Sequence, residues 1–455
     1  MVKNFEIKNK FNEFLKLLFP NNQNRFLYFL SLFYFFNLSL VIVFGRPFVG
    51  LYILGRRLGE VYVLFGALSL VVLFFIAFFF KKSLINDFKN VIFVTFTICL
   101  TFLISLFVNG YTLDLYIFKS SSYIWSLGYC FLGYYFLRKI SREIILLVIF
   151  ISAFALYFVS IINYPNFIID IFISNSDKFQ LIKAADSLLI FVFLNIMFSK
   201  LSNLSEQNKF QILIYSFGMF LPYYIYQSRG SLLAAIIFFV LSTFSYKKYI
   251  YKNLLKVLIF TIIGSSLFYL SSYAITFISV DEEFLPDSLT EATNTIIDEV
   301  LTEKETREGF LTFYIQDGRL FSRDTTTNWR LDIWQDLLDD LSLKNKLILG
   351  FGYTEKFEIM SDPSQPGRLG RDGLNEHVHN YFFNIIGRGG LVQVILFLIF
   401  YSFIYILWIR KNLKSFDFFK LFIPVMIVSG LDVTMEGVHF PFIFFSLLGY
   451  MLSND

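Results

Sequence analysis

Three histidines are the groups in this chain best suited to proton transfer near neutral pH, and all of them lie in its last fifth: His377, His379 and His439. A neutral imidazole that titrates near the working pH can take a proton from a hydroxyl group. We therefore interpret His379, which is followed by the amide Asn380, as a general base. We also predict that His377, Asn380 and Tyr381 contact the substrate.

Two alternatives remain open for these histidines. They are either interfacial residues satisfied by the backbone, or metal ligands together with His439 or Glu376. On a helix, side chains two residues apart point about 200° apart, so only one of His377 and His379 would face a given cavity. No cysteine or carboxylate pair with metal-ligand spacing accompanies them, and we predict no metal and no cofactor.

An arginine beside a predicted helix start is the first candidate for binding an anion. Arg229 lies in a tight turn, residues 226–231, between two apolar stretches. Unpaired N–H groups at a helix start already favour negative charge, so an arginine beside them makes a phosphate site. We predict that Arg229 binds phosphate and that Ser228 and Gly230 contact it. The alternative is an arginine that touches lipid headgroups.

Arg330 is the second candidate, because it shares an apolar stripe with Trp334, Leu337 and Leu341 at helical spacing. An arginine on such a stripe either extends its charge to water or pairs with an anion. From the sequence pattern alone, both alternatives remain open for Arg330.

Further arginines would add positive charge around these groups. Arg46 follows a glycine in the first outer loop, and Arg371 lies near the histidine pair; both are predicted pyrophosphate contacts. Arg368 and Arg388 are also close in sequence and could contribute to a positive pocket. The chain contains no Walker-type glycine loop and no Asp-x-Asp motif. With arginines in place of a metal, the natural substrate is a phosphate or pyrophosphate already in the membrane.

The elements that must position these residues are membrane helices. Of the 455 residues, 56% are apolar and only 16% are charged, with a mean hydropathy of +0.62. A soluble fold cannot bury so much apolar surface, and apolar stretches of about 20 residues mark membrane spans. This composition excludes soluble enzymes, nucleic-acid binders and secreted domains. About twelve stretches are predicted to span, near residues 26–45, 61–80, 91–108, 122–137, 144–163, 184–199, 210–227, 230–246, 254–279, 389–409, 418–432 and 438–452.

Lysine and arginine set the orientation of these spans. With both termini inside, the inner segments hold 21 of these residues and the short outer segments hold 7. This agrees with the positive-inside rule. The chain then divides into spans 1–9 (residues 1–279), a large outer loop (280–376), and a re-entry with spans 10–12 (377–455).

The outer loop is strongly acidic, with 21 acidic and 10 basic residues. A capping box at Ser288 and Glu291 opens one predicted amphipathic helix, and a second starts near Asn328. Two apolar-striped helices indicate a lid over the membrane rather than a solvated spacer, which is the alternative.

Several of these motifs, in this order, resemble the O-antigen ligase and polymerase superfamily. The resemblance rests on Ser228-Arg229-Gly230-Ser231, on Arg330-Leu331-Asp332-Ile333-Trp334 followed by Gly350-Phe351-Gly352, and on His379-Asn380-Tyr381 followed by Gly387 to Leu391. Motif detail covers roughly residues 226–235 and 328–400. The topology is similar along the whole chain.

The resemblance implies an all-α, GT-C-type membrane glycosyltransferase in the bacterial inner membrane. Such an enzyme acts at the periplasmic face on undecaprenyl-pyrophosphate-linked oligosaccharides, without a metal. Arg229 and Arg330 then match the family's phosphate-binding arginines, and His379 matches its base. We expect an inverting polymerase that joins lipid-linked repeat units, with membrane lipid and a chain-length regulator protein as partners and no nucleic acid. The alternatives are an O-antigen ligase, which transfers the glycan to lipid A core, and a glycolipid transporter or flippase.

Overall fold

The computed structural model describes residues 25–79, 83–110, 114, 116–162, 164–176, 182–277, 312–361, 368 and 376–453. This part of the chain is predominantly helical, and the predicted all-α membrane fold is confirmed. Within the described residues, each of the twelve predicted apolar stretches corresponds to one helix or, for the fourth, to two short ones. The helices that cover them are α2 (Arg25–Gly50), α3 (Leu58–Phe79), α4 (Ser83–Asn109), α6 (Ser122–Trp125) with α7 (Gly128–Phe136), α8 (Arg142–Ile162), α10 (Ala184–Leu201), α11 (Glu206–Gln227), α12 (Arg229–Ser245), α14 (Leu254–Phe277), α17 (Tyr381–Arg410), α18 (Ser415–Leu431) and α19 (His439–Ser453).

Seven helices in the described ranges are long and apolar enough to cross a membrane by themselves: α2, α3, α4, α8, α10, α14 and α17. Helices α12 and α19 are apolar but shorter, with 17 and 15 residues. The fourth predicted span is interrupted. It consists of the short helices α6 and α7 and the 3-10 turn η1 (Leu137–Lys139), with α5 (Tyr116–Ser120) before them.

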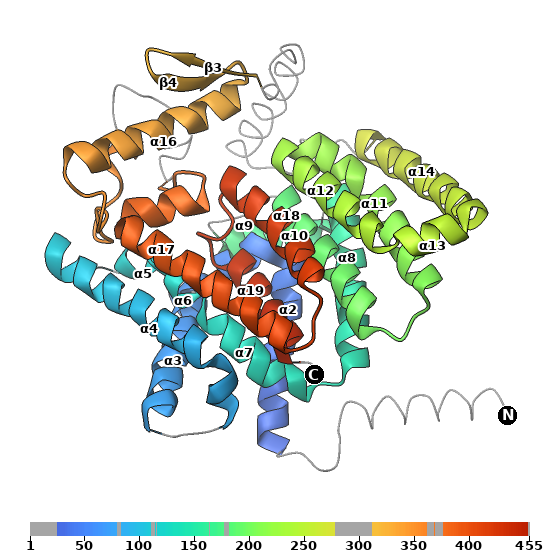
Figure 1. Ribbon diagram of the computed structural model, residues 1–455, viewed down its shortest axis with the longest axis horizontal. Helices are drawn as coiled ribbons and strands as arrows, with labels where there is room; N and C mark the ends of the chain where they lie inside the picture. Colours follow the sequence, from blue (N-terminus) through green and yellow to red (C-terminus); the bar gives the residue numbers. More distant parts are fainter. Residues whose placement is uncertain are drawn as a thin grey trace.

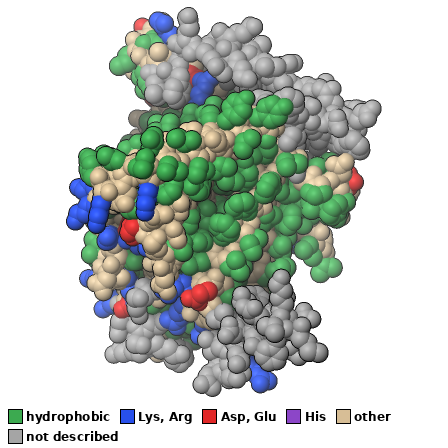
Figure 2. All heavy atoms as spheres, turned by 90° about the vertical axis from the view of Figure 1, so that its right-hand side faces the viewer, with side chains coloured by type: hydrophobic (Ala, Val, Ile, Leu, Met, Phe, Trp, Pro, Cys, Tyr) green, Lys and Arg blue, Asp and Glu red, His purple; other side chains and the backbone are tan. Residues whose placement is uncertain are grey.

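An apolar surface surrounds the helical bundle, as a membrane protein requires. Helix α14 presents large side chains to the outside, including Leu255, Leu258 and Tyr269, which are 72%, 56% and 70% exposed. Figure 2 shows hydrophobic side chains over most of the described part of this face. Charged side chains gather toward its edges in the same view. Together with the long apolar helices, an exposed apolar area of this kind is typical of a surface that contacts lipid.

The interior of the bundle is packed around α10 and α19, whose side chains are almost all buried. Glycines allow the closest contact, between α19 and α7: a Cβ at Gly449 would lie 2.0 Å from the carbonyl oxygen of Cys130. Small residues let membrane helices approach in this way. The contact fixes α19, and therefore the position of His439 at its first residue.

Helix α2 bends before its end, and the bend orients Arg46. Gly45 has a φ of +53°, a left-handed conformation that glycine adopts without steric cost, and Pro47 follows within the helix. Beyond α2 the chain forms a two-stranded hairpin, β1 (Tyr52–Ile53) and β2 (Arg56–Arg57), and enters α3. Two short helices outside the spans, α9 (Asn166–Asn175) and α13 (Lys247–Lys252), were not predicted.

The large loop is structured in its second half. Strands β3 (Phe313–Gln316) and β4 (Arg319–Ser322) form a hairpin, and α16 (Thr325–Leu343) and the 3-10 turn η4 (Glu358–Met360) follow. The hairpin and α16 lie at one end of the molecule, above α17 (Figure 1). The second predicted loop helix is thus present, although it starts at Thr325 rather than near Asn328. The first one, with Ser288 and Glu291, lies outside the described residues.

Candidate functional site

The two loop histidines lie in a bent, non-helical segment directly before α17. The helical argument about their directions therefore does not apply. Val378 between them is fully buried, and its carbonyl oxygen accepts a hydrogen bond of 2.7 Å from Trp334 Nε1 on α16. His377 and His379 consequently face different surroundings.

His379 itself has a φ of +53°. A side chain other than glycine rarely adopts this conformation, and such residues gather at functional sites. The next residue, Asn380, is the N-cap of α17, where its Oδ1 accepts hydrogen bonds from the N–H groups of Phe382 and Phe383. Its Nδ2 donates to the Gly430 carbonyl oxygen, 2.9 Å away at the end of α18. Asn380 thus ties the histidine segment to α18.

The His379 ring is surrounded by an aromatic side chain and by charges. Its centroid lies 5.0 Å from that of Trp329 in an edge-to-face contact. Burial lowers the pKa of His379 to about 3; nearby Asp432 opposes this effect, and Arg330 and Lys183 add to it. The imidazole is therefore neutral at physiological pH, and in this arrangement it titrates well below the working pH that the sequence argument assumed.

Asp432 lies just beyond the end of α18 and connects these groups. Its Oδ1 is 3.4 Å from Lys183 Nζ. Burial alone would raise the pKa of Asp432, but Lys183, His379 and Arg330 together hold it below its ordinary value. We call His379, Arg330, Lys183 and Asp432 the His379 cluster. It combines one neutral imidazole, two cations and one carboxylate at a single end of the helical bundle.

Arg229 adjoins this cluster through α16. It is the first residue of α12, and its Nη1 forms an ion pair with Asp324, the N-cap residue of α16. Ser228 caps α12 by accepting a hydrogen bond from the Ser231 N–H group. A Cβ at Gly230 would lie 3.2 Å from Leu431, the residue before Asp432. The starts of α12 and α16 therefore meet at the end of α18.

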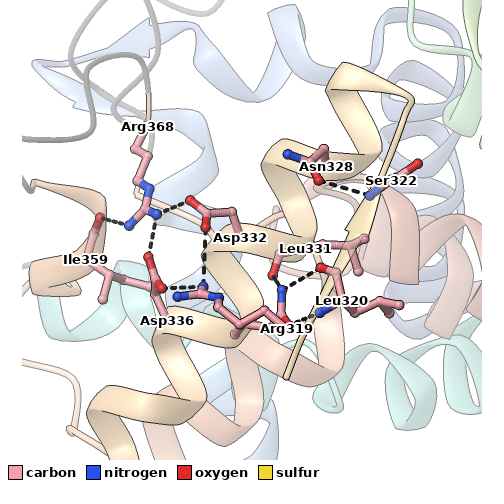
Figure 3. Close-up of polar contacts among 10 residues, drawn as sticks. Arg319, Leu320, Ser322, Asn328, Leu331, Asp332, Asp336, Ile359 and Arg368 are labelled. Carbon is pink, nitrogen blue, oxygen red and sulfur yellow. Dashed lines mark hydrogen bonds and ion pairs between the residues drawn. The ribbon is translucent and has the colours of Figure 1, made fainter. Parts of the chain in front are cut away.

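A network of ion pairs holds α16 against the rest of the loop (Figure 3). Arg319 on β4 and Arg368 each bridge Asp332 and Asp336, which lie one turn apart on α16. The Arg368 Nη1 group also donates to the Ile359 carbonyl oxygen at 3.1 Å. Arg368 is therefore neutralised and only 2% exposed, so the prediction that it adds charge to a positive pocket is wrong.

The apolar stripe of α16 lies on the other side of the helix and forms a small core. Leu337 and Leu341 are fully buried there against Phe357, and Trp334 stacks on Phe383 of α17 at 5.1 Å. A solvated spacer would not bury such a stripe, so that alternative is wrong for residues 312–361. The packing places Arg330 beside His379.

Arg388 on α17 also has a structural role. Its guanidinium group is buried and donates to the Gly352 and Glu355 carbonyl oxygens and to the Tyr116 hydroxyl group. It also lies 4.1 Å over the Phe357 ring. These contacts fasten α17 to the end of the loop, so Arg388 is not available to a substrate in this arrangement.

A cavity of about 650 Å³ lies next to the His379 cluster. It opens between the end of α2, the start of α3, α5 and the turn from α18 to α19. Five cationic side chains line it: Arg46, Arg56, Arg57, Lys119 and Lys183. Its other polar residues are Glu60, Tyr116, Ser122, His377, Glu436 and His439, and its apolar wall includes Val61, Leu64 and Phe118. Pockets of this size and mixed character bind small organic ligands.

Charges around the cavity affect its two best-placed titratable groups. Burial lowers the pKa of His377 to about 3, and Arg388, Lys119 and Arg46 lower it further, while Glu376 opposes them. Burial raises the pKa of Glu436 to about 8, so this carboxyl group holds its proton at neutral pH. The cavity therefore presents a neutral imidazole and a neutral carboxyl group beside a cationic wall.

The predicted residues thus separate into several groups. Arg330 and His379 lie in one cluster, with Arg229 adjoining it, whereas Arg46 and His377 line the neighbouring cavity. Lys183 belongs to both the cluster and the cavity and connects them.

The remaining predicted contacts have other places. Ser228 and Asn380 cap helices. Tyr381 is 1% exposed and its hydroxyl group lies 3.0 Å from that of Tyr401, so it is a core residue and not a substrate contact in this arrangement. Gly230 packs against α18. Arg371 lies outside the described residues.

Sequence reasoning missed Lys183 and Asp186 as parts of the site. It considered His439 only as a possible metal ligand. The Asp186 Oδ1 atom lies 3.0 Å from His439 Nε2, although the two residues are 253 positions apart. A carboxylate next to the predicted start of an apolar helix was the available signal. Among the described residues, no group of three or more histidine, cysteine or acidic side chains could hold a metal ion.

Comparison with known proteins gives one family match. No curated protein matches the chain. Residues 214–398 match a family model described as O-antigen ligase. The match includes Arg229, Arg330, His377 and His379, whereas Arg46, Lys183, Asp432 and His439 lie outside it. Residues 214–398 therefore carry an O-antigen ligase domain, which supports a relationship of the chain to the O-antigen ligase and polymerase superfamily.

Proposed function

We propose that this protein is an O-antigen polymerase, which joins polyprenyl-pyrophosphate-linked oligosaccharide repeat units at the periplasmic face of the bacterial inner membrane. The family match by itself supports a less specific function, that of a membrane enzyme of the glycosyltransferase type acting in O-antigen synthesis. The observation that carries the proposal is the His379 cluster, in which a neutral imidazole lies beside Arg330 and Lys183 at the edge of a cationic cavity.

The proposed reaction is an inverting displacement. A sugar hydroxyl oxygen of the acceptor attacks the anomeric carbon of the donor, and His379 takes the hydroxyl proton. The bond between that carbon and the phosphate oxygen breaks, and its electron pair stays on the lipid pyrophosphate. Attack from the side opposite the leaving group inverts the anomeric centre.

Cations are the groups that this leaving pyrophosphate requires. Its charge grows as the glycosidic bond breaks, and a well-placed donor stabilises such charge by roughly 3–4 kcal/mol. Arg330 and Arg229 are the proposed hydrogen-bond donors to the pyrophosphate. Lys183 and Arg46 extend the positive surface toward the cavity. The Arg330 charge is one cause of the low pKa of His379. A pyrophosphate bound to Arg330 would offset this charge, so that donor binding makes the imidazole a better base.

The apolar side of the cavity suits the lipid part of these substrates. Val61, Leu64 and Phe118 line it, and their side chains are 49%, 53% and 46% exposed. A polyprenyl chain could therefore enter sideways from the membrane. We propose undecaprenyl pyrophosphate as the carrier.

The ligase remains the second candidate, because the matching family model is described as O-antigen ligase. Deleting the gene separates the two. Lipopolysaccharide whose core carries one repeat unit indicates a lost polymerase, whereas a bare core with lipid-linked polymer accumulating indicates a lost ligase. Complementation with Arg330→Ala and His379→Ala should fail although both proteins insert. Wild-type chain lengths with either variant would contradict the proposed site.

A further inference from the structure

His439 and Asp186 form a buried pair that the proposed reaction does not use. His439 is the first residue of α19 and Asp186 lies in the first turn of α10, and their side chains are 8% and 9% exposed. The carboxylate accepts a hydrogen bond from Nε2, which leaves Nδ1 as the second ring nitrogen able to bond a ligand. No described residue forms a hydrogen bond with Nδ1, and His439 lines the cavity.

Glu436 is a second polar residue of the same cavity wall. It is 2% exposed and lies on the turn between α18 and α19. Its Oε2 accepts a hydrogen bond of 3.0 Å from the Thr434 N–H group, and its carbonyl oxygen accepts one from Ser122. Its Oε1 is buried and, within the described ranges, makes no hydrogen bond. A buried polar atom without a partner costs free energy, which a bound ligand would recover.

His377, in the segment before α17, is the third polar residue of this set. It lines the cavity, and its Nδ1 is likewise buried with no hydrogen-bond partner among the residues described. Three polar side chains from two separate segments, His377, Glu436 and His439, thus line one cavity with unused hydrogen-bonding capacity. Buried polar atoms without hydrogen-bond partners destabilise the folded protein unless a ligand bonds to them.

These groups fit a neutral, hydroxyl-rich ligand better than an anion. Imidazole Nδ1 accepts a hydrogen bond, and a carboxyl group can donate or accept one, whereas the Asp186 carboxylate behind His439 would repel a diphosphate. A sugar ring offers hydroxyl groups of both kinds. Of the five cations that line the cavity, Lys183 also belongs to the His379 cluster and is therefore the one placed to contact the diphosphate.

We propose that this cavity is a sugar-binding subsite for the acceptor glycan, in which His439, held by Asp186, and Glu436 hydrogen-bond its hydroxyl groups. The inference rests on the proposed glycosyltransferase function. The segment 377–379 borders the cavity through His377 and the cluster through His379, so a glycan bound in the cavity brings its terminal hydroxyl group toward the proposed base. Asp186 is a positioning residue that fixes the ring of His439.

The test measures transfer between two separate substrates. Full-length protein in lipid nanodiscs receives lipid-linked repeat unit, isolated from the deletion strain, as the donor. The acceptor is the free oligosaccharide released from the same lipid by mild acid and labelled at its reducing end. Elongation of the label gives kcat and KM for the acceptor, and varying the donor gives its KM.

We expect His439→Gln and Glu436→Gln to raise the acceptor KM about tenfold, the effect of one lost hydrogen bond of about 1.4 kcal/mol. Their kcat and donor KM should change less than threefold. Asp186→Asn should raise the acceptor KM as well. Asp417→Asn is the matched control. Asp417 lies in the first turn of α18, where it is also buried and pairs with Lys200 and Lys420. It should leave every constant unchanged.

Each outcome decides the question. An unchanged acceptor KM in folded His439→Gln and Glu436→Gln overturns the subsite, as does a rise confined to the donor KM or an equal rise in Asp417→Asn. If His439→Gln does not fold, Glu436→Gln alone carries the test. Failure of the wild-type protein to transfer at all would instead count against the proposed function.

Discussion

Asp324→Asn separates two roles that the structure gives to Arg229. Arg229 pairs with Asp324 and thereby holds the start of α16, and it is also a proposed pyrophosphate donor. Asparagine caps helices as well as aspartate does, so the variant keeps the hydrogen bond from the Thr327 N–H group, now 2.8 Å from Oδ1. Only the charge of the partner is lost.

The expected cost follows from the burial of the two side chains. Asp324 is 3% exposed and Arg229 is 42% exposed. A pair of two exposed groups contributes about 0–1 kcal/mol, and breaking a fully buried one costs about 3–5 kcal/mol. Solvent screens the half-exposed guanidinium, so Asp324→Asn should destabilise the docking of α16 by about 1–2 kcal/mol. Thermal unfolding and hydrogen exchange of α16 measure this loss.

Transfer activity distinguishes the two roles. Arg229→Ala should lower kcat by about 10²–10³, the effect of one lost donor to a developing negative charge. Asp324→Asn should lower it less than tenfold, because Arg229 stays in place. The double variant Arg229→Ala/Asp324→Asn should be at least as stable as Arg229→Ala, because Arg229→Ala alone leaves the buried Asp324 carboxylate without this cation. Equal losses of activity in Arg229→Ala and Asp324→Asn would refute a direct role of Arg229 in binding pyrophosphate.

Three further predictions concern protons and metals. Because the pKa of His379 is lowered to about 3, kcat/KM should stay flat as the pH falls through 6.5, and a loss of activity centred there would contradict the assignment. Glu436 holds its proton in the folded state up to about pH 8, whereas an unfolded glutamate ionises near 4.5. Since the folded state binds the extra proton, stability should fall as the pH rises through this window, by up to about 1.4 kcal/mol per pH unit. Unfolding midpoints of Glu436→Gln should lack this fall. Finally, EDTA should leave transfer unchanged, and strong metal dependence would revive the histidine-ligand alternative.

Sequence periodicity predicted the helices well because it reflects local burial. The apolar stripe of Arg330, Trp334, Leu337 and Leu341 correctly indicated an amphipathic helix, which packs as α16. The twelve apolar stretches likewise correspond to helices. The interruption near residue 126 and the hairpins β1–β2 and β3–β4 were not predicted, since short elements depend on tertiary packing more than on pattern.

The composition of the site was less accessible from the sequence. His439 pairs with Asp186, and Lys183 with Asp432, across about 250 residues, and no local pattern encodes such contacts. Arg368 looked like an available cation until the structure placed it between Asp332 and Asp336. Charge counted along the chain cannot show which charges neutralise one another. Residue type indicated the chemistry of the site, and only the fold shows which residues meet.

The most direct test of the central claim is a structure with a donor that cannot react. Cryo-electron microscopy of the protein in nanodiscs with a phosphonate analogue of the lipid-linked repeat unit would locate the diphosphate. We expect its oxygens within hydrogen-bonding distance of the Arg330 guanidinium group, with Arg229 or Lys183 as a second contact and the anomeric carbon facing His379. A diphosphate bound away from the His379 cluster would contradict this expectation.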